Sequence, residues 1–320
     1  MKNLIIRLIP LADIFLVPLV FISACIMKII RRAGIQRLPL SKKTLLGVGV
    51  FPVSNHYYEP QFDFRENKHS FSEERSLPGI NWNTEEQLET LKKLTFYSEL
   101  ANIQTTKTDD LLFHFNNGAF ESGDAEFWYQ LIRSKKPNRI FEIGSGNSTL
   151  MAINAILKNK EDNPDYKCKH VCIEPYEMPW LEKTGVIVVR KKVEDVDVSF
   201  FYELDEGDIL FIDSSHMIRP EGDVLFEYLQ LLPSLKKGVI VHIHDIFSPR
   251  NYLGEWLKDH VYFWNEQYLL EAFLSHNSDW KVIAALNYLH HNQYEALKKA
   301  CPFLTSDREP GSFYIQRIGN

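Results

Sequence analysis

Residues 138–149 hold the combination of side chains best suited to chemistry in this chain. An apolar run carries one acidic residue, Glu142, and leads into a turn with two glycines, Gly144 and Gly146. The polar residues 147–149 follow and can cap the start of a helix. Glycines let backbone approach a ligand closely, and the free amides of a helix N-terminus face it. The pattern therefore predicts a site for a nucleotide-like ligand between a strand and a helix.

The position held by Thr149 separates two classes of such ligands. A dinucleotide-binding turn needs a third glycine there. The carboxylate of Glu142, two residues before the first glycine, suits an amino group better than a pyrophosphate. S-adenosylmethionine (SAM) carries an amino group and no pyrophosphate. We therefore expect SAM as the cofactor, bound by Glu142, Gly144, Gly146 and Ser148, and not a nicotinamide dinucleotide.

Two further carboxylates follow predicted strands, where open α/β sheets bind their ligands. Glu174 ends the segment 169–174 and can accept hydrogen bonds from both ribose hydroxyls; a solvated strand end is the alternative. Glu194 follows the next predicted strand. It is placed either beside the adenine or at a helix start, where acidic residues are favoured in any case. Both are assigned here to the cofactor site, with these alternatives left open.

Candidate catalytic residues cluster after the next two predicted strands. Asp213 ends one strand and can touch the cofactor, a metal or the acceptor, and His216 follows as a candidate general base. His244 and Asp245 end the other strand, and His244 is the second candidate base. Asp213, His244 and Asp245, with His216 beside them, could also hold Mg or Mn. His242, inside the strand, is expected to be a hydrogen-bonded core residue.

The segments after these two strands are expected to cover a pocket for the acceptor. Aromatic faces beside polar groups suit sugar rings, although core packing explains aromatic residues equally well. The residues concerned are Arg219, Arg250, Tyr252, Trp256, Trp264, Asn265 and Glu266.

The elements that must position these residues alternate along the chain. The predicted strands are 139–143, 169–174, 186–190, 208–213, 238–244, 280–285 and 312–318. The predicted helices are 84–103, 123–133, 148–158, 177–183, 196–203, 221–234 and 264–275. Alternation at this spacing indicates a parallel sheet covered on both faces. The expected fold is α/β: a doubly wound, Rossmann-like, seven-stranded sheet.

The N-terminal segment 8–27 is apolar except for Asp13. Twenty helical residues span about 30 Å, the thickness of a bilayer core. Basic residues gather in 28–43, which predicts an inner-membrane anchor with the rest of the chain facing the cytoplasm. Pro18 leaves a kinked, interfacial or re-entrant helix open, and Cys25 leaves a cleaved lipoprotein signal open.

The composition of the chain argues against several kinds of partner and cross-link. The net charge of -6 and pI near 6.0 give no electrostatic reason to expect nucleic acid as a partner. Four cysteines are too few for a disulfide framework, and Cys168 and Cys172 have no second pair with which to form a zinc site. We expect three segments: a membrane helix with its basic flank (1–45), an aromatic-rich arm and helix (46–115), and a catalytic domain (116–320).

Residues 116–320 resemble the class I SAM-dependent methyltransferases, and more narrowly a largely uncharacterised bacterial group with an N-terminal membrane segment. The runs that carry the resemblance are Gly123-Asp124-Ala125, Glu142-Ile-Gly-Ser-Gly-Asn-Ser148, Phe211-Ile-Asp213-Ser-Ser-His216 and His242-Ile-His244-Asp245-Ile-Phe. The resemblance implies SAM as cofactor. Similar enzymes that methylate catechols hold a metal with two Asp and an Asn. Here His244 and Asp245 replace the Asp-Asn pair, which puts metal dependence in doubt.

These observations predict a membrane-attached O-methyltransferase that acts on a hydroxyl of a glycan or of a lipid-linked acceptor. Two alternatives stay open. One is a SAM-binding assembly protein without catalysis, because binding and catalytic residues belong to different motifs. The other is an NAD(P)-dependent Rossmann oxidoreductase, against which the missing third glycine counts.

Overall fold

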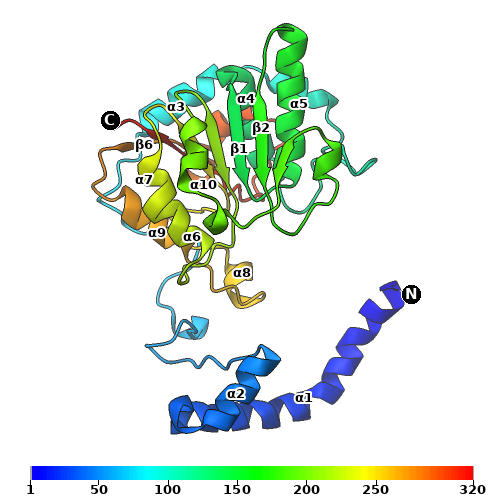
Figure 1. Ribbon diagram of the computed structural model, residues 1–320, viewed down its shortest axis with the longest axis vertical. Helices are drawn as coiled ribbons and strands as arrows, with labels where there is room; N and C mark the ends of the chain where they lie inside the picture. Colours follow the sequence, from blue (N-terminus) through cyan, green and yellow to red (C-terminus); the bar gives the residue numbers. More distant parts are fainter. Residues whose placement is uncertain (1, 320) are drawn as a thin grey trace. The chain divides into compact units, whose positions relative to one another are not determined.

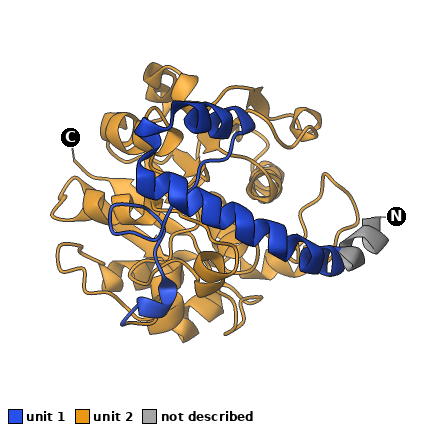
Figure 2. Ribbon diagram, turned by 90° about the horizontal axis from the view of Figure 1, so that it is seen from below, with its two compact units in different colours: residues 1–68 blue, residues 69–320 orange. Residues whose placement is uncertain are grey.

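The computed structural model describes residues 2–319, with side chains from Ile9 onward. The first and last predicted segments begin at Met1 and end at Asn320, and both of these residues lie outside the described residues. So does the side chain of Leu8, the first residue of the predicted membrane segment. The chain forms two compact units, Met1–Lys68 and His69–Asn320 (Figure 2). The predicted segment 46–115 contributes to both units, and the three-segment division stays a prediction.

The first unit is built around one long helix. Its helical elements are α1 (Lys2–Ala33), the 3-10 helix η1 (Ile35–Arg37), α2 (Pro39–Val48) and the 3-10 helix η2 (Phe64–Glu66). Within α1, Ile9–Ala33 is long and apolar enough to cross a membrane, and none of its most apolar window is buried. The helix is bent (Figure 1) and contains Pro10 and Pro18, which cannot donate main-chain hydrogen bonds.

The second unit contains a seven-stranded sheet in the order β3-β2-β1-β4-β5-β7-β6 (Figure 1). The strands are β1 (Arg139–Ile143), β2 (Lys169–Ile173), β3 (Ile187–Val189), β4 (Ile209–Ile212), β5 (Ile240–Ile243), β6 (Trp280–Ala285) and β7 (Phe313–Arg317). The first five are parallel, and β7 lies antiparallel between β5 and β6. The expected Rossmann-like α/β fold is thereby confirmed.

Helices cover both faces of this sheet. They are α3 (Thr84–Lys93), α4 (Asp124–Lys135), α5 (Asn147–Asp162), α6 (Asp223–Phe226), α7 (Leu232–Ser234), α8 (Gly254–Lys258), α9 (Glu266–Leu274), α10 (Leu286–Asn292) and α11 (Tyr294–Ala300). Successive strand residues point to opposite faces. Ile140 accordingly joins the core shared with α4 and α5, and Phe141 joins the core shared with α6 and α9. This double burial explains the nearly continuous apolar strands.

Three helix predictions need correction. The predicted helix 84–103 ends at Lys93, because buried Leu94 has extended backbone angles; a separate 3-10 helix, η3 (Tyr97–Asn102), follows. The predicted helices 177–183 and 196–203 shrink to the 3-10 segments η4 (Leu181–Lys183) and η6 (Val198–Glu203). Valine, phenylalanine and tyrosine in the latter have weak helix propensity.

Strand register brings the predicted site residues together. Ile143 of β1 pairs with Ile212 of β4, which pairs with Ile243 of β5. The next residue of each strand therefore leaves the sheet at the same level. These three residues are Gly144, Asp213 and His244.

Candidate active site

A cavity of about 750 Å³ opens at the carboxyl ends of β1, β2, β4 and β5. Its lining includes most of the residues predicted from the sequence: Gly144, Gly146, Ser148, Glu174, Glu194, Asp213, His244 and Asp245. Glu142 and His216 are not part of the lining and lie beneath it, with no more than 4% of either residue exposed. The cavity has the size of a small-molecule site, and its lining combines apolar and aromatic side chains with a few polar groups.

The two positions of the turn accommodate glycine for different structural reasons. Gly144 has a φ of +75°, and a Cβ there would lie 2.0 Å from the main-chain oxygen of Asp213. Gly144 thus allows the main chain at the end of β4 to pass close by, whereas the sequence analysis expected a ligand to approach there. At Gly146 a Cβ would meet only Met178 Cε, at 3.6 Å, so this glycine faces open space in the cavity.

Glu142 points away from the cavity. Its carboxylate lies 2.6 Å from His170 Nε2 and accepts hydrogen bonds from the hydroxyls of Thr149 (2.6 Å) and Ser148 (3.2 Å). Burial lowers the pKa of His170, but Glu142 and Cys172 outweigh it and raise that pKa to about 10. Glu142 therefore supports the turn from behind, and its direct contact with a cofactor stays a prediction.

Glu174 and Glu194 line the cavity on the β2 and β3 side. Glu174 follows β2, and its Oε1 accepts main-chain hydrogen bonds from Tyr176 (3.0 Å) and Glu177 (2.9 Å). These bonds fix the carboxylate at the strand end, as a ribose-binding residue requires. Glu194 lies in the short 3-10 helix η5 (Val193–Asp195) and lines the cavity; its place beside an adenine stays a prediction.

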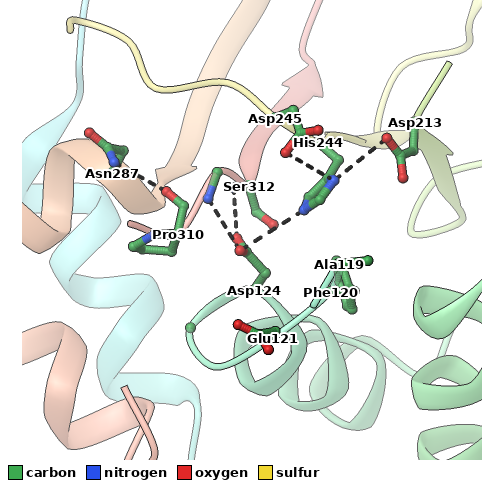
Figure 3. A network of polar contacts seen from close by, with 12 residues as sticks. Ala119, Phe120, Glu121, Asp124, Asp213, His244, Asp245, Asn287, Pro310 and Ser312 are labelled. Carbon is green, nitrogen blue, oxygen red and sulfur yellow. Dashed lines mark hydrogen bonds and ion pairs between the residues drawn. The ribbon is translucent and has the colours of Figure 1, made fainter. Parts of the chain in front are cut away.

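An acidic and histidine cluster lies where β4 and β5 end, with Asp213, His244 and Asp245 in the cavity lining and His216 beneath them. His216 Nε2 lies 3.3 Å from Asp213 Oδ1 and 3.5 Å from Asp245 Oδ2. His244 Nδ1 lies 3.6 Å from Asp213 Oδ1 and 3.5 Å from Asp245 Oδ1 (Figure 3). The four residues predicted to carry chemistry are thus mutual neighbours, although they come from two different loops.

Charge pairing sets the protonation of this cluster. Burial lowers the pKa of His244, but Asp245 and Asp213 outweigh it and raise that pKa to about 10. Burial likewise opposes a charged His216, yet hydrogen bonds to Asp213 and Glu266 hold its pKa well above the ordinary value. Burial acts to raise the pKa of Asp213, and the two histidines reverse this and lower it. Charge pairing thus favours the protonated form of both histidines and the ionised form of Asp213, whereas burial raises the pKa of Asp245.

His216 is held from beneath by the start of α9. Its Nδ1 lies 2.8 Å from Glu266 Oε2, and Tyr228 donates to the other oxygen of Glu266 at 3.0 Å. The main-chain amides of Asn265 and Glu266 both donate to the carbonyl of His216. The sequence placed Glu266 near the acceptor pocket; the structure buries it completely, under His216.

The backbone around the cluster is strained. His216 and Asp245 both have a φ of +58°, the left-handed region that side chains rarely adopt. Such strain costs about 1–3 kcal/mol and persists where surrounding contacts over-determine it, which occurs often at functional sites. Here the contacts of Glu266 with His216 supply one such constraint.

The residues before β7 hold Asp124, which lies next to His244 and outside the cavity lining. Asp124, at the start of α4, accepts main-chain hydrogen bonds from Gly311 (3.2 Å) and Ser312 (2.7 Å), and its carboxylate lies 4.0 Å from His244 Nε2 (Figure 3). His242 is fully buried, and its Nε2 lies 2.8 Å from Ser312 Oγ, as expected of a core histidine.

Aromatic side chains form one wall of the cavity. The ring of Tyr262 stacks on Trp264 with centroids 4.6 Å apart, and Trp256 meets Trp264 edge to face at 5.1 Å. Arg219 also lines the cavity, as predicted, whereas Tyr252 is buried behind the wall. Sequence reasoning missed Tyr262, Phe120 and Met178 as lining residues, because their segments carry no recognisable motif.

Comparison with known proteins agrees with this geometry. Residues 141–246 match the family model described as "Methyltransferase domain". A protein of Archaeoglobus fulgidus described as uncharacterized is 33% identical over 172 residues, covering 49% of this chain and 75% of that relative.

Two solved structures of the plantazolicin methyltransferase BpumL are also similar. Both hold S-adenosylhomocysteine (SAH), one with a triazolic and one with a pentazolic desmethylPZN analog. They are 13% and 12% identical, with TM-scores of 0.36 and 0.38. They cover 74% and 73% of this chain and 98% of their own. TM-scores this low say nothing about the substrate of this chain.

The matched domain begins in β1 beside the glycine turn and ends just after β5, so it encloses the floor of the cavity. The 33% identical relative covers enough of both chains to establish common descent. With the seven-stranded order and the turn at Gly144 and Gly146, these matches show that the chain belongs to the class I SAM-dependent methyltransferases.

Proposed function

We propose that this chain transfers the methyl group of SAM to a hydroxyl on a ring-shaped acceptor, such as a sugar of a glycan or of a lipid-linked saccharide. The observation that carries the proposal is the position of the acidic and histidine cluster. It lies on the floor of one cavity whose lining includes both the glycine turn and the aromatic wall. A cofactor on one side and an acceptor on the other would meet above Asp213.

The cofactor half is assigned to the turn and the ends of β2 and β3. Gly144, Gly146 and Ser148 would hold the methionine part of SAM, Glu174 would bind the ribose, and Glu194 would border the adenine; all five line the cavity. Asp213, at the end of β4, would face the reacting methyl group. Glu142 acts indirectly, through the turn that it supports.

The reaction is a displacement at the methyl carbon. The acceptor oxygen forms a bond to this carbon while the bond from carbon to sulfur breaks, and SAH leaves with the electron pair. For His216 or His244 to act as the base, one ring must first give its own proton to a neighbouring carboxylate or to solvent. The neutral ring then takes the acceptor proton, and Asp213 orients both rings. Holding the two reactants in line lowers the barrier, because the entropy of bringing them together is lost on binding rather than in the reaction.

The aromatic wall supports a ring-shaped acceptor. Trp256, Tyr262 and Trp264 present apolar ring faces and edges to the cavity, and Arg219 adds a polar group. Sugar rings combine apolar faces with polar rims, and tryptophan and tyrosine complement both.

The cluster also fits a divalent ion such as Mg or Mn. Asp213, His216 and Asp245 each offer a ligand atom, all within 4.8 Å of one another. Glu266 binds the far nitrogen of His216, the arrangement usual for metal-binding histidines. The sequence analysis also placed His244 among the metal ligands. Within the described residues its buried Nδ1 makes no hydrogen bond, and it faces the carboxylates of Asp213 and Asp245. A bound ion would make an acceptor hydroxyl more acidic.

The N-terminal unit supports a membrane location. We assign α1 to the inner membrane, with the basic residues of 28–43 and the catalytic unit on the cytoplasmic side. Attachment to the bilayer would raise the effective concentration of a lipid-linked acceptor.

The testing experiment is calorimetric titration of the detergent-solubilised chain with SAH, with and without Mg or Mn, beside a Glu174→Ala control. We expect micromolar binding by the chain and at least tenfold weaker binding by the control. Turnover is then measured as SAH released from SAM in the presence of membrane lipid extract. SAH binding without turnover on any extract would favour a silent assembly protein. No SAH binding by a folded chain would refute the methyltransferase proposal.

A further inference from the structure

A buried polar group lies directly beneath the glycine turn. Glu142 and His170 project from β1 and β2 on the same face of the sheet, the face that α5 covers. Thr149, in the first turn of α5, completes the group. We propose that Thr149, Glu142 and His170 form a relay that holds the turn at Gly146 in the shape that SAM requires. The inference rests on the proposed assignment of this turn to SAM.

The relay is a continuous line of hydrogen bonds. The main-chain amide of Gly146 donates to Thr149 Oγ1 at 3.1 Å. The Thr149 hydroxyl donates to Glu142 Oε2 at 2.6 Å, and His170 Nε2 lies 2.6 Å from Glu142 Oε1. The main-chain amide of Gly146, in the loop, is thereby connected through the Thr149 hydroxyl to strands β1 and β2 of the sheet.

The charges of the relay are mutually dependent. Glu142 is completely buried, and an ionised carboxylate in such a place needs compensation by a partner charge and by hydrogen bonds. His170, only 7% exposed, supplies the charge, and Thr149 and Ser148 supply hydroxyl donors. The carboxylate of Glu142 accepts from the Thr149 hydroxyl and so orients that hydroxyl toward itself. The Thr149 lone pairs are then left to accept from Gly146.

The relay explains why Thr149 stands where a dinucleotide-binding turn has glycine. Glycine there would remove the only side-chain acceptor recorded for the Gly146 amide within the described residues. The amide would be free to bind a phosphate, as it does at other helix N-termini. With threonine the amide is already used, and the turn presents its other groups to the cavity. Thr149 is thus a positioning residue that favours SAM over a pyrophosphate-containing cofactor.

The effect on binding differs from an effect on folding. Gly144, Gly146 and Ser148 all line the cavity, so a shift of this turn changes the cofactor site directly. The three relay residues themselves do not line it. Loss of the Thr149 hydroxyl should therefore loosen the turn locally while the sheet and α5 stay in place.

The test compares two substitutions in the full chain, one nearly isosteric with threonine and one that only lacks its methyl group. Thr149→Val removes the hydroxyl, and Thr149→Ser keeps it. We expect Thr149→Val to weaken SAH binding at least tenfold by calorimetry, and Thr149→Ser to remain within threefold of the unchanged chain. Thr90→Val, which loses a hydroxyl bond on the exposed face of α3, is the matched control and should leave SAH affinity unchanged.

Hydrogen exchange gives a readout that a general loss of stability would not reproduce. Without ligand, peptides spanning 143–150 should exchange faster in Thr149→Val, while peptides of β4 and β5 keep their protection. If Thr149→Val does not fold, His170→Gln tests the other end of the relay and should also weaken SAH binding.

Equal SAH affinity in Thr149→Val and the unchanged chain would overturn the relay. So would equal losses in the valine and serine variants, since one of them keeps the hydroxyl. If the unchanged chain itself fails to bind SAH, the proposed function fails, and that result is distinct from a failure of the relay.

Discussion

His216 Nδ1 lies 2.8 Å from Glu266 Oε2, although the two residues are 50 positions apart in the chain. The contact joins the loop after β4 to the start of α9. It leaves Nε2 of His216 facing Asp213 and Asp245, so the direction of the ring is set by a residue that never reaches the cavity.

Replacing Glu266 by glutamine should weaken binding of Mn2+ to the chain by about 10–100-fold, because a metal-binding histidine loses its orienting carboxylate. Calorimetric titration with Mn2+ measures the change. Glu271→Gln is the control, since that carboxylate, on the same helix, pairs with Arg75 and not with a histidine. Equal Mn2+ affinity in all three proteins would argue against the proposed metal site.

Gly144→Ala should abolish SAH binding and destabilise the chain by more than ~1 kcal/mol, because it adds backbone strain and a clash with the Asp213 carbonyl. Gly207→Ala separates the two causes. Gly207 has a φ of +85° and no atom near its added Cβ, so it tests the strain alone. Denaturant midpoints and SAH titration report both effects. A milder loss at Gly144 than at Gly207 would contradict the steric argument.

The aromatic wall can be tested apart from the cofactor site. Tyr262→Ala removes the ring stacked on Trp264 and should reduce turnover on membrane lipid extract about tenfold, at unchanged SAH affinity. Tyr262→Phe keeps the ring and should retain most of the activity. Should both variants turn over normally, the acceptor does not use this wall.

The buried pair of Glu142 and His170 makes stability depend on pH in the alkaline range. The folded-state pKa of His170 is about 10, above the ordinary value near 6.5. The folded chain therefore holds one extra proton between these values. The stabilisation is complete below about pH 6.5 and falls by about 1.4 kcal/mol per unit as pH rises toward 10.

His170→Gln lacks this titration. The difference in denaturant midpoint between the unchanged chain and this variant should therefore shrink as pH rises from 7 to 9.5. A difference that stays constant over that range would mean that His170 is not protonated in the folded state.

Deletion of residues 1–45 should release the protein from the membrane fraction and leave SAH affinity within threefold, because the cavity is lined only by residues of the second unit. Fractionation and SAH titration measure the two effects. A truncated protein that folds but stays with the membrane would place the attachment elsewhere in the chain.

The strands were predictable because burial on both faces makes most of them largely apolar, and their boundaries fell within one or two residues of the structure. The end of the helix that begins at Thr84 was not predictable. The apolar spacing continues through Leu94, but the backbone of Leu94 is extended and its side chain is buried. Apolar spacing identifies a buried face but not the residue at which a helix ends.

The residues of the candidate site were likewise predictable only in part. Asp213 and His244 could be located from strand ends alone, because parallel strands finish at one edge. Glu266 and His170 could not be assigned their partners, since those contacts join residues 50 and 28 positions apart. The direction of Glu142 was open to prediction: it shares the strand face of Ile140, which packs against α5 and not against the cavity.

The placement of β7 has a consequence for how the protein is made. This strand lies inside the sheet, between β5 and β6, yet it follows the other six strands in sequence. Synthesis must therefore pass residue 312 before β5 gains its second neighbour and Asp124 its main-chain donors. Domains otherwise fold from the N-terminus during synthesis. A message truncated before codon 312 would thus yield a product with an open sheet edge and an unfinished active site, which quality control could recognise.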